Sequence, residues 1–130
     1  MKTDEVIIKK SKIHGLGVFA KRDFRKGEVV LHWDISHIIT KEEMKKMTEK
    51  EKRYVSFLNN RYVVMQKPEN RINHSCEANT NAKDFCDITI VDIKKGEEIT
   101  ADYSKDLAPG EKLICHCGSN NCRKIIENNN

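Results

Sequence analysis

The sequence predicts a single, mostly β domain. Its length of 130 residues suits one domain that buries roughly two-thirds of its unfolded surface. The turns Phe24–Val30 (FRKGEVV) and Ile93–Ile99 (IKKGEEI) both place Lys-Gly-Glu before an apolar run, and glycine there can adopt positive φ. Short runs typical of strands recur along the chain, at Val6–Ile8, Val18–Ala20, Val29–Leu31, Tyr62–Met65, Ile88–Val91 and Ile99–Ala101.

The stretch Thr40–Asn59 interrupts this pattern and predicts helix. Thr40 is followed three residues later by Glu43, and Thr48 by Glu51, which is the spacing of two capping boxes. Lys, Glu and Met dominate the residues between them. We expect either one helix broken at Met47–Thr48 or two short helices.

Beyond Ser104 the periodicity fades, and KDLAPGEKLICHCGSNNCRK predicts an irregular tail that another group must order. No apolar run is long enough for a signal peptide or a bilayer span, so we expect an intracellular protein without membrane contact. Five cysteines in a reducing compartment argue against a disulfide framework and favour metal ligands or a reactive thiol.

Three of the cysteines, Cys115, Cys117 and Cys122, share one short loop. Thiolates at this spacing can converge on a tetrahedral zinc ion at a Zn–S distance of about 2.3 Å. The fourth ligand could be His116, Cys86, His74 or Cys76. His116 stands between two ligands and should point away, and Cys86 follows Phe85 as an ordinary buried thiol would. We favour Cys76, because the polar stretch RINHSCEANT around it contributes little to a hydrophobic core. The alternative is a set of reduced cysteines without metal.

The charge is uneven along the chain, with a basic first half and a slightly acidic second half within a net charge of +4. The acidic half could receive a cationic substrate, although a solvated surface explains the asymmetry equally well. One alternative function is a zinc-stabilised interaction domain that contacts nucleic acid. Asp23 interrupts the basic stretch and few aromatic residues accompany it, so the pattern does not favour direct nucleic acid binding. The basic residues concerned are Lys9, Lys10, Lys12, Lys21, Arg22, Arg25 and Lys26.

Four motifs, in a fixed order from Ile13 to Lys124, resemble the SET-domain protein-lysine methyltransferases with a post-SET zinc segment. They are His14–Phe19 (HGLGVF), Arg71–Cys76 (RINHSC), Gly96–Tyr103 (GEEITADY) and the cysteine-rich tail. Three departures from the family pattern are Ala78 in place of proline, Lys124 in place of a frequent glycine, and a short region before Arg71, which lines the substrate groove in relatives.

The resemblance implies a small, stand-alone SET fold of several small β-sheets. Residues 1–107 would form the SET domain, with a helical insert at about 40–59, and residues 108–126 the post-SET segment. It also implies a C-terminal pseudoknot, in which the end of the chain passes through a loop around Asn73–Cys76. Packing rules alone argue against such threading.

The implied reaction is methyl transfer from S-adenosylmethionine to the ε-amine of a protein lysine, presented on a basic, flexible tail. Tyr103 would be the catalytic residue and would also contact the cofactor. Asn73 would accept a hydrogen bond from the amino group of the cofactor, and the His74 main chain would pair with the adenine. Gly15, Leu16 and Gly17 would bring main chain close to the amino-acid end, where a Cβ would obstruct approach. The implied zinc ligands are Cys76, Cys115, Cys117 and Cys122.

Other expectations follow from the same resemblance. Trp33, Tyr54, Phe57, Tyr62 and Phe85 are candidates to line a lysine channel with Tyr103, and Ile125 and Ile126 could close that channel. A second copy of the chain could complete the groove. The protein would be cytoplasmic in a microbe, and nuclear or host-nuclear in a eukaryote or a virus. A SET-type binding module without catalysis is a further alternative, against which the presence of Asn73, His74 and Tyr103 speaks.

Overall fold

The computed structural model describes residues 5–115 and 117–127. Strands dominate these residues, the helices are short, and the mostly β prediction is confirmed. The strands are β1 (Val6–Lys10), β2 (Leu16–Ala20), β3 (Val29–His32), β4 (Ile38–Ile39), β5 (Val55–Leu58), β6 (Arg61–Val64), β7 (Asn73–His74), β8 (Thr80–Lys83), β9 (Cys86–Thr89), β10 (Glu98–Ala101), β11 (Lys112–Ile114) and β12 (Ile125–Glu127). The helices are α1 (Lys41–Lys45) and α2 (Glu49–Lys52), with 3₁₀ turns η2 (Glu69–Arg71) and η3 (Tyr103–Lys105).

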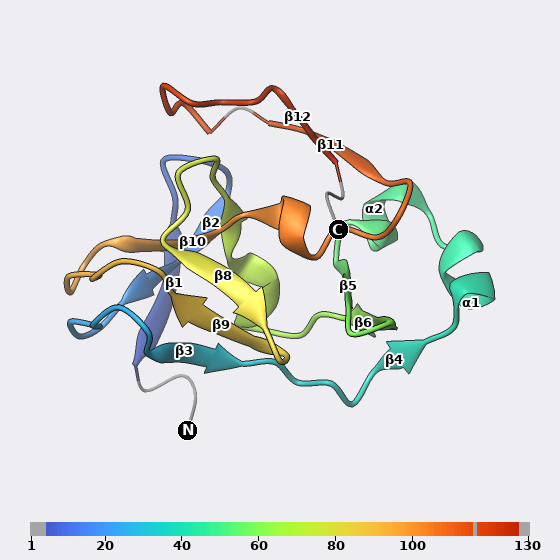
Figure 1. Cartoon of the computed structure of the whole chain (residues 1–130), viewed down its shortest axis with the longest axis horizontal. Helices are drawn as coiled ribbons and strands as arrows, with labels where there is room; N and C mark the ends of the chain where they lie inside the picture. The colour runs from blue at the N-terminus through green and yellow to red at the C-terminus, as the bar shows by residue number, and fades with distance from the viewer. Residues whose placement is uncertain (1–4, 116, 128–130) are drawn as a thin grey trace.

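A seven-stranded sheet forms one side of the molecule, and the smaller β4–β6–β5 sheet with α1 and α2 forms the other (Figure 1). Strand β10 is the centre of the larger sheet. It pairs antiparallel with β2 and parallel with both β7 and β8. Val18 and Ile99 are paired across β2 and β10 and are fully buried, so apolar burial specifies this register.

The parallel pairing of β10 with β7 brings Asn73–Ser75 beside Thr100–Ala101. The Ser75 N–H donates to the Ala101 carbonyl at 3.1 Å, which satisfies main-chain groups of a polar, buried segment. Strand β10 therefore lies between the N-terminal hairpin and the RINHSCEANT stretch.

The two Lys-Gly-Glu turns have the expected chemistry. Gly27 and Gly96 have φ of 92° and 93°. In each turn the glutamate carboxylate accepts a hydrogen bond from the main chain three residues earlier, from Arg25 to Glu28 and from Lys94 to Glu97. These turns are therefore closed locally, as the sequence indicates.

The helical prediction was right at its start and wrong at its end. Both capping boxes are present, at Thr40–Glu43 and Thr48–Glu51, and the helix breaks between them. Residues 55–58 are strand β5 instead of helix. Asn59 and Asn60 have φ of 51° and 60°, and this two-residue turn folds β5 back onto β6.

The tail is more regular than its composition predicts. Strands β11 and β12 pair antiparallel and flank the cysteine loop, and this hairpin crosses one end of the molecule (Figure 1). Ile126 faces inward and is 1% exposed, whereas its neighbours on the other face, Ile114 and Ile125, are 71% and 57% exposed. Burial of Ile126 near η3 is therefore one of the contacts that order the tail.

Candidate functional site

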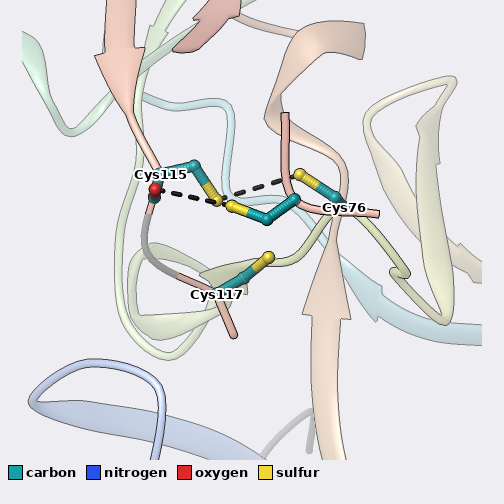
Figure 2. A group of neighbouring side chains, drawn as sticks. Cys76, Cys115 and Cys117 are labelled. Carbon is teal, nitrogen blue, oxygen red and sulfur yellow. Dashed lines mark hydrogen bonds between the residues drawn. The ribbon is translucent and has the colours of Figure 1, made fainter. Parts of the chain in front are cut away.

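The four predicted zinc ligands meet in space. The sulfur atoms of Cys76, Cys115, Cys117 and Cys122 all lie within 4.8 Å of one another, and the Cys76 and Cys115 sulfurs are 3.8 Å apart. Figure 2 shows the side chains of Cys76, Cys115 and Cys117 pointing toward one another. Tetrahedral ligands at a Zn–S distance of about 2.3 Å have sulfurs about 3.8 Å apart. The group could therefore hold a zinc ion.

The thiols of the cluster differ in how readily they ionise. Burial opposes ionisation of the Cys117 thiol. Hydrogen bonds from Ser119 and from the cysteines around Cys117 outweigh this effect of burial and lower the pKa of the thiol to about 5. Burial raises the pKa of the adjacent Cys115 thiol to about 12. Four thiolates this close repel one another, and a divalent ion at their centre would remove that penalty.

The other candidates for the fourth ligand lie elsewhere or have other contacts. Cys86 is on β9, where its sulfur lies 3.3 Å from His32 Nδ1 and 3.5 Å from the Asp84 carbonyl. It is half-buried, not fully buried as its position after Phe85 predicted, because it lies at the end of a hairpin. His116 lies outside the described residues.

His74 connects the cysteine cluster to Tyr103. Its Nδ1 accepts a hydrogen bond from the Tyr103 N–H at 3.0 Å, and its Nε2 lies 3.5 Å from the Cys76 sulfur. Because Nδ1 accepts, the ring proton belongs on Nε2, where it can be donated to the sulfur. Burial lowers the pKa of His74, which favours this neutral ring. The imidazole thus contacts both the Tyr103 main chain and the Cys76 sulfur.

Arg123 makes a second connection, which sequence reasoning missed. Its main-chain N and its Nε lie 3.3 and 3.4 Å from the Cys76 sulfur, and its Nη2 donates to Asp102 Oδ1 at 2.8 Å. The same Asp102 oxygen accepts from the Ser104 N–H and hydroxyl, which caps η3. Partial burial favours protonated Asp102, but bonds from Arg123 and Ser104 outweigh it and hold its pKa below the usual value. The one sequence signal that could have pointed to Arg123 was its position directly after Cys122, a predicted zinc ligand.

Tyr103 lines a cavity of about 50 Å³. Its hydroxyl donates to the Ile72 carbonyl, and burial raises the pKa of the phenol above its usual value. Of the predicted channel aromatics, Trp33 and Tyr54 line this cavity. The remaining predicted aromatics pack elsewhere: Phe57 on Tyr62, with ring centroids 4.8 Å apart, and Phe85 on Trp33, at 6.1 Å. Ile125 and Ile126 are not among the lining residues.

The cavity also contains carboxylates, which the sequence did not indicate. Asp87 accepts a hydrogen bond from Trp33 Nε1 at 3.1 Å, and Glu69 accepts one from the Asp34 N–H at 2.9 Å. Asp106 lies in the same lining, and burial raises its pKa to about 7. A cavity lined by aromatic rings and carboxylates suits an aliphatic chain that ends in an amine.

The predicted cofactor residues also come together. The Asn73 side-chain amide donates to the carbonyls of His14 and Leu16 at 3.0 and 3.2 Å, and to Glu98 Oε2 at 2.9 Å. Gly15 has a φ of 44°, which explains glycine there. Asn73 is buried, and Leu16 is exposed at the surface of this turn. The turn that precedes β2 and the residues of β7 thus lie side by side and form one wall of the predicted cofactor site.

Among the described residues, no helix combines the length and the apolar character that a membrane span requires.

The SET domain family model matches residues 15–104. Histone-lysine N-methyltransferase 2D of Homo sapiens is 36% identical over 93% of the chain, which spans 2% of that protein. Histone-lysine N-methyltransferase trr of Drosophila melanogaster is 32% identical over 93% of the chain, and here the chain spans 6% of the relative.

A candidate histone methyltransferase of Plasmodium falciparum, known from its crystal structure, has the same fold. The TM-score is 0.65 at 21% identity, and the match covers 76% of this chain and 92% of that one. The family model covers well over half of the chain, and its match includes both the turn around Gly15 and the segment that ends in Tyr103. The chain therefore belongs to the SET domain family.

Proposed function

We propose that the protein transfers a methyl group from S-adenosylmethionine to the ε-amine of a lysine in a protein substrate, with Tyr103 as the catalytic residue. The observation that carries this proposal is the position of Tyr103. It lines a narrow cavity on one side and is joined through His74 to the Asn73 segment and to the cysteine cluster on the other. The named relatives are histone-lysine methyltransferases, so a histone tail is the first substrate to test.

The cofactor, when bound, supplies a methyl group on a positively charged sulfur. Asn73 would hold its amino group, the main chain of Gly15, Leu16 and Gly17 would lie close to its amino-acid end, and the His74 main chain would pair with its adenine. The Nδ2 side of the Asn73 amide is already engaged with three acceptors, which leaves Oδ1 as the atom available to a ligand amine.

The lysine must lose its proton before it can attack. At a reference pKa near 10.4, only about one lysine in 2,500 is neutral at pH 7. Aromatic walls and a neighbouring positive charge both lower this pKa and would have to outweigh the carboxylates of the cavity, which raise it; the proton then leaves to water at the mouth of the cavity. The Tyr103 hydroxyl orients the lone pair, so that the new N–C bond forms in line as the C–S bond breaks.

The cysteine cluster would hold a structural zinc ion. A closed set of four thiolates leaves no position for a substrate, so this metal would order the tail and take no part in the chemistry. His74 and Arg123 both contact the start of the turn that contains Tyr103, at the Tyr103 N–H and at the Asp102 side chain, and the ordered tail would hold them in place.

The test is methyl incorporation from radiolabelled S-adenosylmethionine into core histones, by the wild type and by Tyr103→Phe. We expect activity only in the wild type, with cofactor binding retained in the variant. Full activity in Tyr103→Phe would refute the role of this residue. Cofactor binding by the wild type without transfer to any protein of a cell extract would support the catalytically inactive binding module instead.

A further inference from the structure

We propose that Glu98 is a positioning residue of the cofactor site, which orients Asn73 and the turn before β2 toward the amino-acid end of S-adenosylmethionine. This inference rests on the proposed function, because it assumes that Asn73 receives the cofactor. Glu98 is the first residue of β10 and lies opposite Phe19 of β2. Its own carbonyl accepts a hydrogen bond from the Asn79 amide at 2.9 Å, which fixes the main chain beneath its carboxylate.

The carboxylate determines which way the Asn73 amide faces. Asn73 Nδ2 lies 2.9 Å from Glu98 Oε2 and also contacts the carbonyls of His14 and Leu16. A flipped amide would place its oxygen against three acceptors, one of them charged, and would lose every hydrogen bond. The orientation shown is therefore the only one that satisfies these groups, and it directs Oδ1 away from Glu98.

The same carboxylate fixes the turn through Ser11. The Ser11 hydroxyl donates its single proton to Glu98, at 2.7 Å from Oε1 and 2.9 Å from Oε2. Its lone pairs then accept from the Ile13 N–H at 2.9 Å and the His14 N–H at 3.4 Å. The Ser11 N–H donates to the Gly15 carbonyl at 2.8 Å, which closes the turn. One carboxylate thus holds both the Asn73 wall and the glycine-containing turn.

The absence of a side chain at Gly17 leaves room for the Glu98 carboxylate. A Cβ at this position would overlap Glu98 Oε2 and would lie 3.0 Å from Ser11 Cβ. The space beside Gly17 is thus occupied by the Glu98 carboxylate. The missing side chain is what allows the carboxylate to reach Ser11 and Asn73 together.

The experiment compares two ligands by calorimetry. S-adenosylmethionine carries the amino-acid end, and 5′-methylthioadenosine lacks it. For Glu98→Gln we expect affinity for S-adenosylmethionine to fall about tenfold, because a neutral amide is a weaker and less selective acceptor for the Asn73 amide. Affinity for 5′-methylthioadenosine should stay within twofold of the wild type. The matched control is Glu97→Gln, whose carboxylate, within the part of the chain that the structure describes, closes the Lys94 turn and has no contact with Asn73 or Ser11, so both affinities should stay unchanged.

A second variant guards against a misfolded Glu98→Gln. Gly17→Ala retains the charge of Glu98, but its Cβ would overlap Glu98 Oε2 and force the carboxylate to shift, so it should show the same selective loss. In an Asn73→Ala background, Glu98→Gln should have a smaller effect than in the wild type, because only the contact of Glu98 with Ser11 remains to be lost.

Unchanged S-adenosylmethionine affinity in Glu98→Gln, or equal losses for both ligands, would overturn the positioning role while the proposed function survives. Absence of S-adenosylmethionine binding in the wild type would overturn both.

Discussion

Replacement of Arg123 by glutamine tests whether the tail is held in place by this side chain. The variant keeps most of the length and removes the charge that joins the Cys76 sulfur to Asp102. A charge-assisted hydrogen bond in a protein contributes about 1.5–3 kcal/mol. The Arg123 and Asp102 side chains are 38% and 20% exposed, so solvent screening reduces this contribution. We therefore assign about 1–2 kcal/mol to tail docking, equivalent to about a 5- to 30-fold change in tail opening.

The assay follows zinc transfer from the protein to a coloured chelator under conditions where tail opening limits the rate. Arg123→Gln should release zinc about 5 to 30 times faster than the wild type. The control is Lys124→Gln, which removes the neighbouring positive charge. Among the described residues, the Lys124 side chain makes no hydrogen bond or ion pair. It should release zinc at nearly the wild-type rate. If the two variants release zinc equally fast, Arg123 does not hold the tail.

Three further predictions concern the tail and the cavity. Lys124 has a φ of 69°, so Lys124→Gly should stabilise the tail by about 1 kcal/mol, measured as slower zinc release. Removal of zinc by a chelator should abolish methyl transfer and leave the far-UV circular dichroism of the β core largely unchanged; undiminished transfer would contradict this. Burial raises the pKa of Asp106 to about 7, so the folded state binds this proton more tightly than the unfolded chain does. This contribution is fully present below about pH 4 and is lost by pH 7, a fall of up to about 4 kcal/mol in unfolding free energy. In Asp106→Asn the fall should be smaller by that amount, as denaturant titrations across the range will show.

Local chemistry made several features predictable from the sequence. The two capping boxes, the positive-φ glycines of the Lys-Gly-Glu turns and the convergence of Cys115, Cys117 and Cys122 each depend on residues a few positions apart. Their geometry is set by short-range sterics and hydrogen bonding, and the structure contains all three. The helix was extended too far because Val55–Leu58 has no signal that distinguishes helix from strand until its pairing with β6 is known.

The family resemblance supplied what spacing could not, namely the crossing at Asn73–Cys76 and the roles expected of Tyr103 and Asn73. Neither composition nor periodicity predicts that β10 pairs with β7, because parallel pairing between distant segments leaves no local pattern. Cys76 was chosen as the fourth ligand from the polarity around it, and the tertiary structure places its sulfur among the other three.

The sequence by itself determined the short-range features of this protein: where the two short helices begin, which turns need glycine and which thiols share a loop. Only the tertiary structure decided that Arg123 would reach Asp102, that Glu98 would lie between Ser11 and Asn73, and that Asp106 would share a cavity with Tyr103. These contacts join residues from separate elements. Their energies depend on burial and charge that exist only after the elements have packed, so no local pattern in the chain records them.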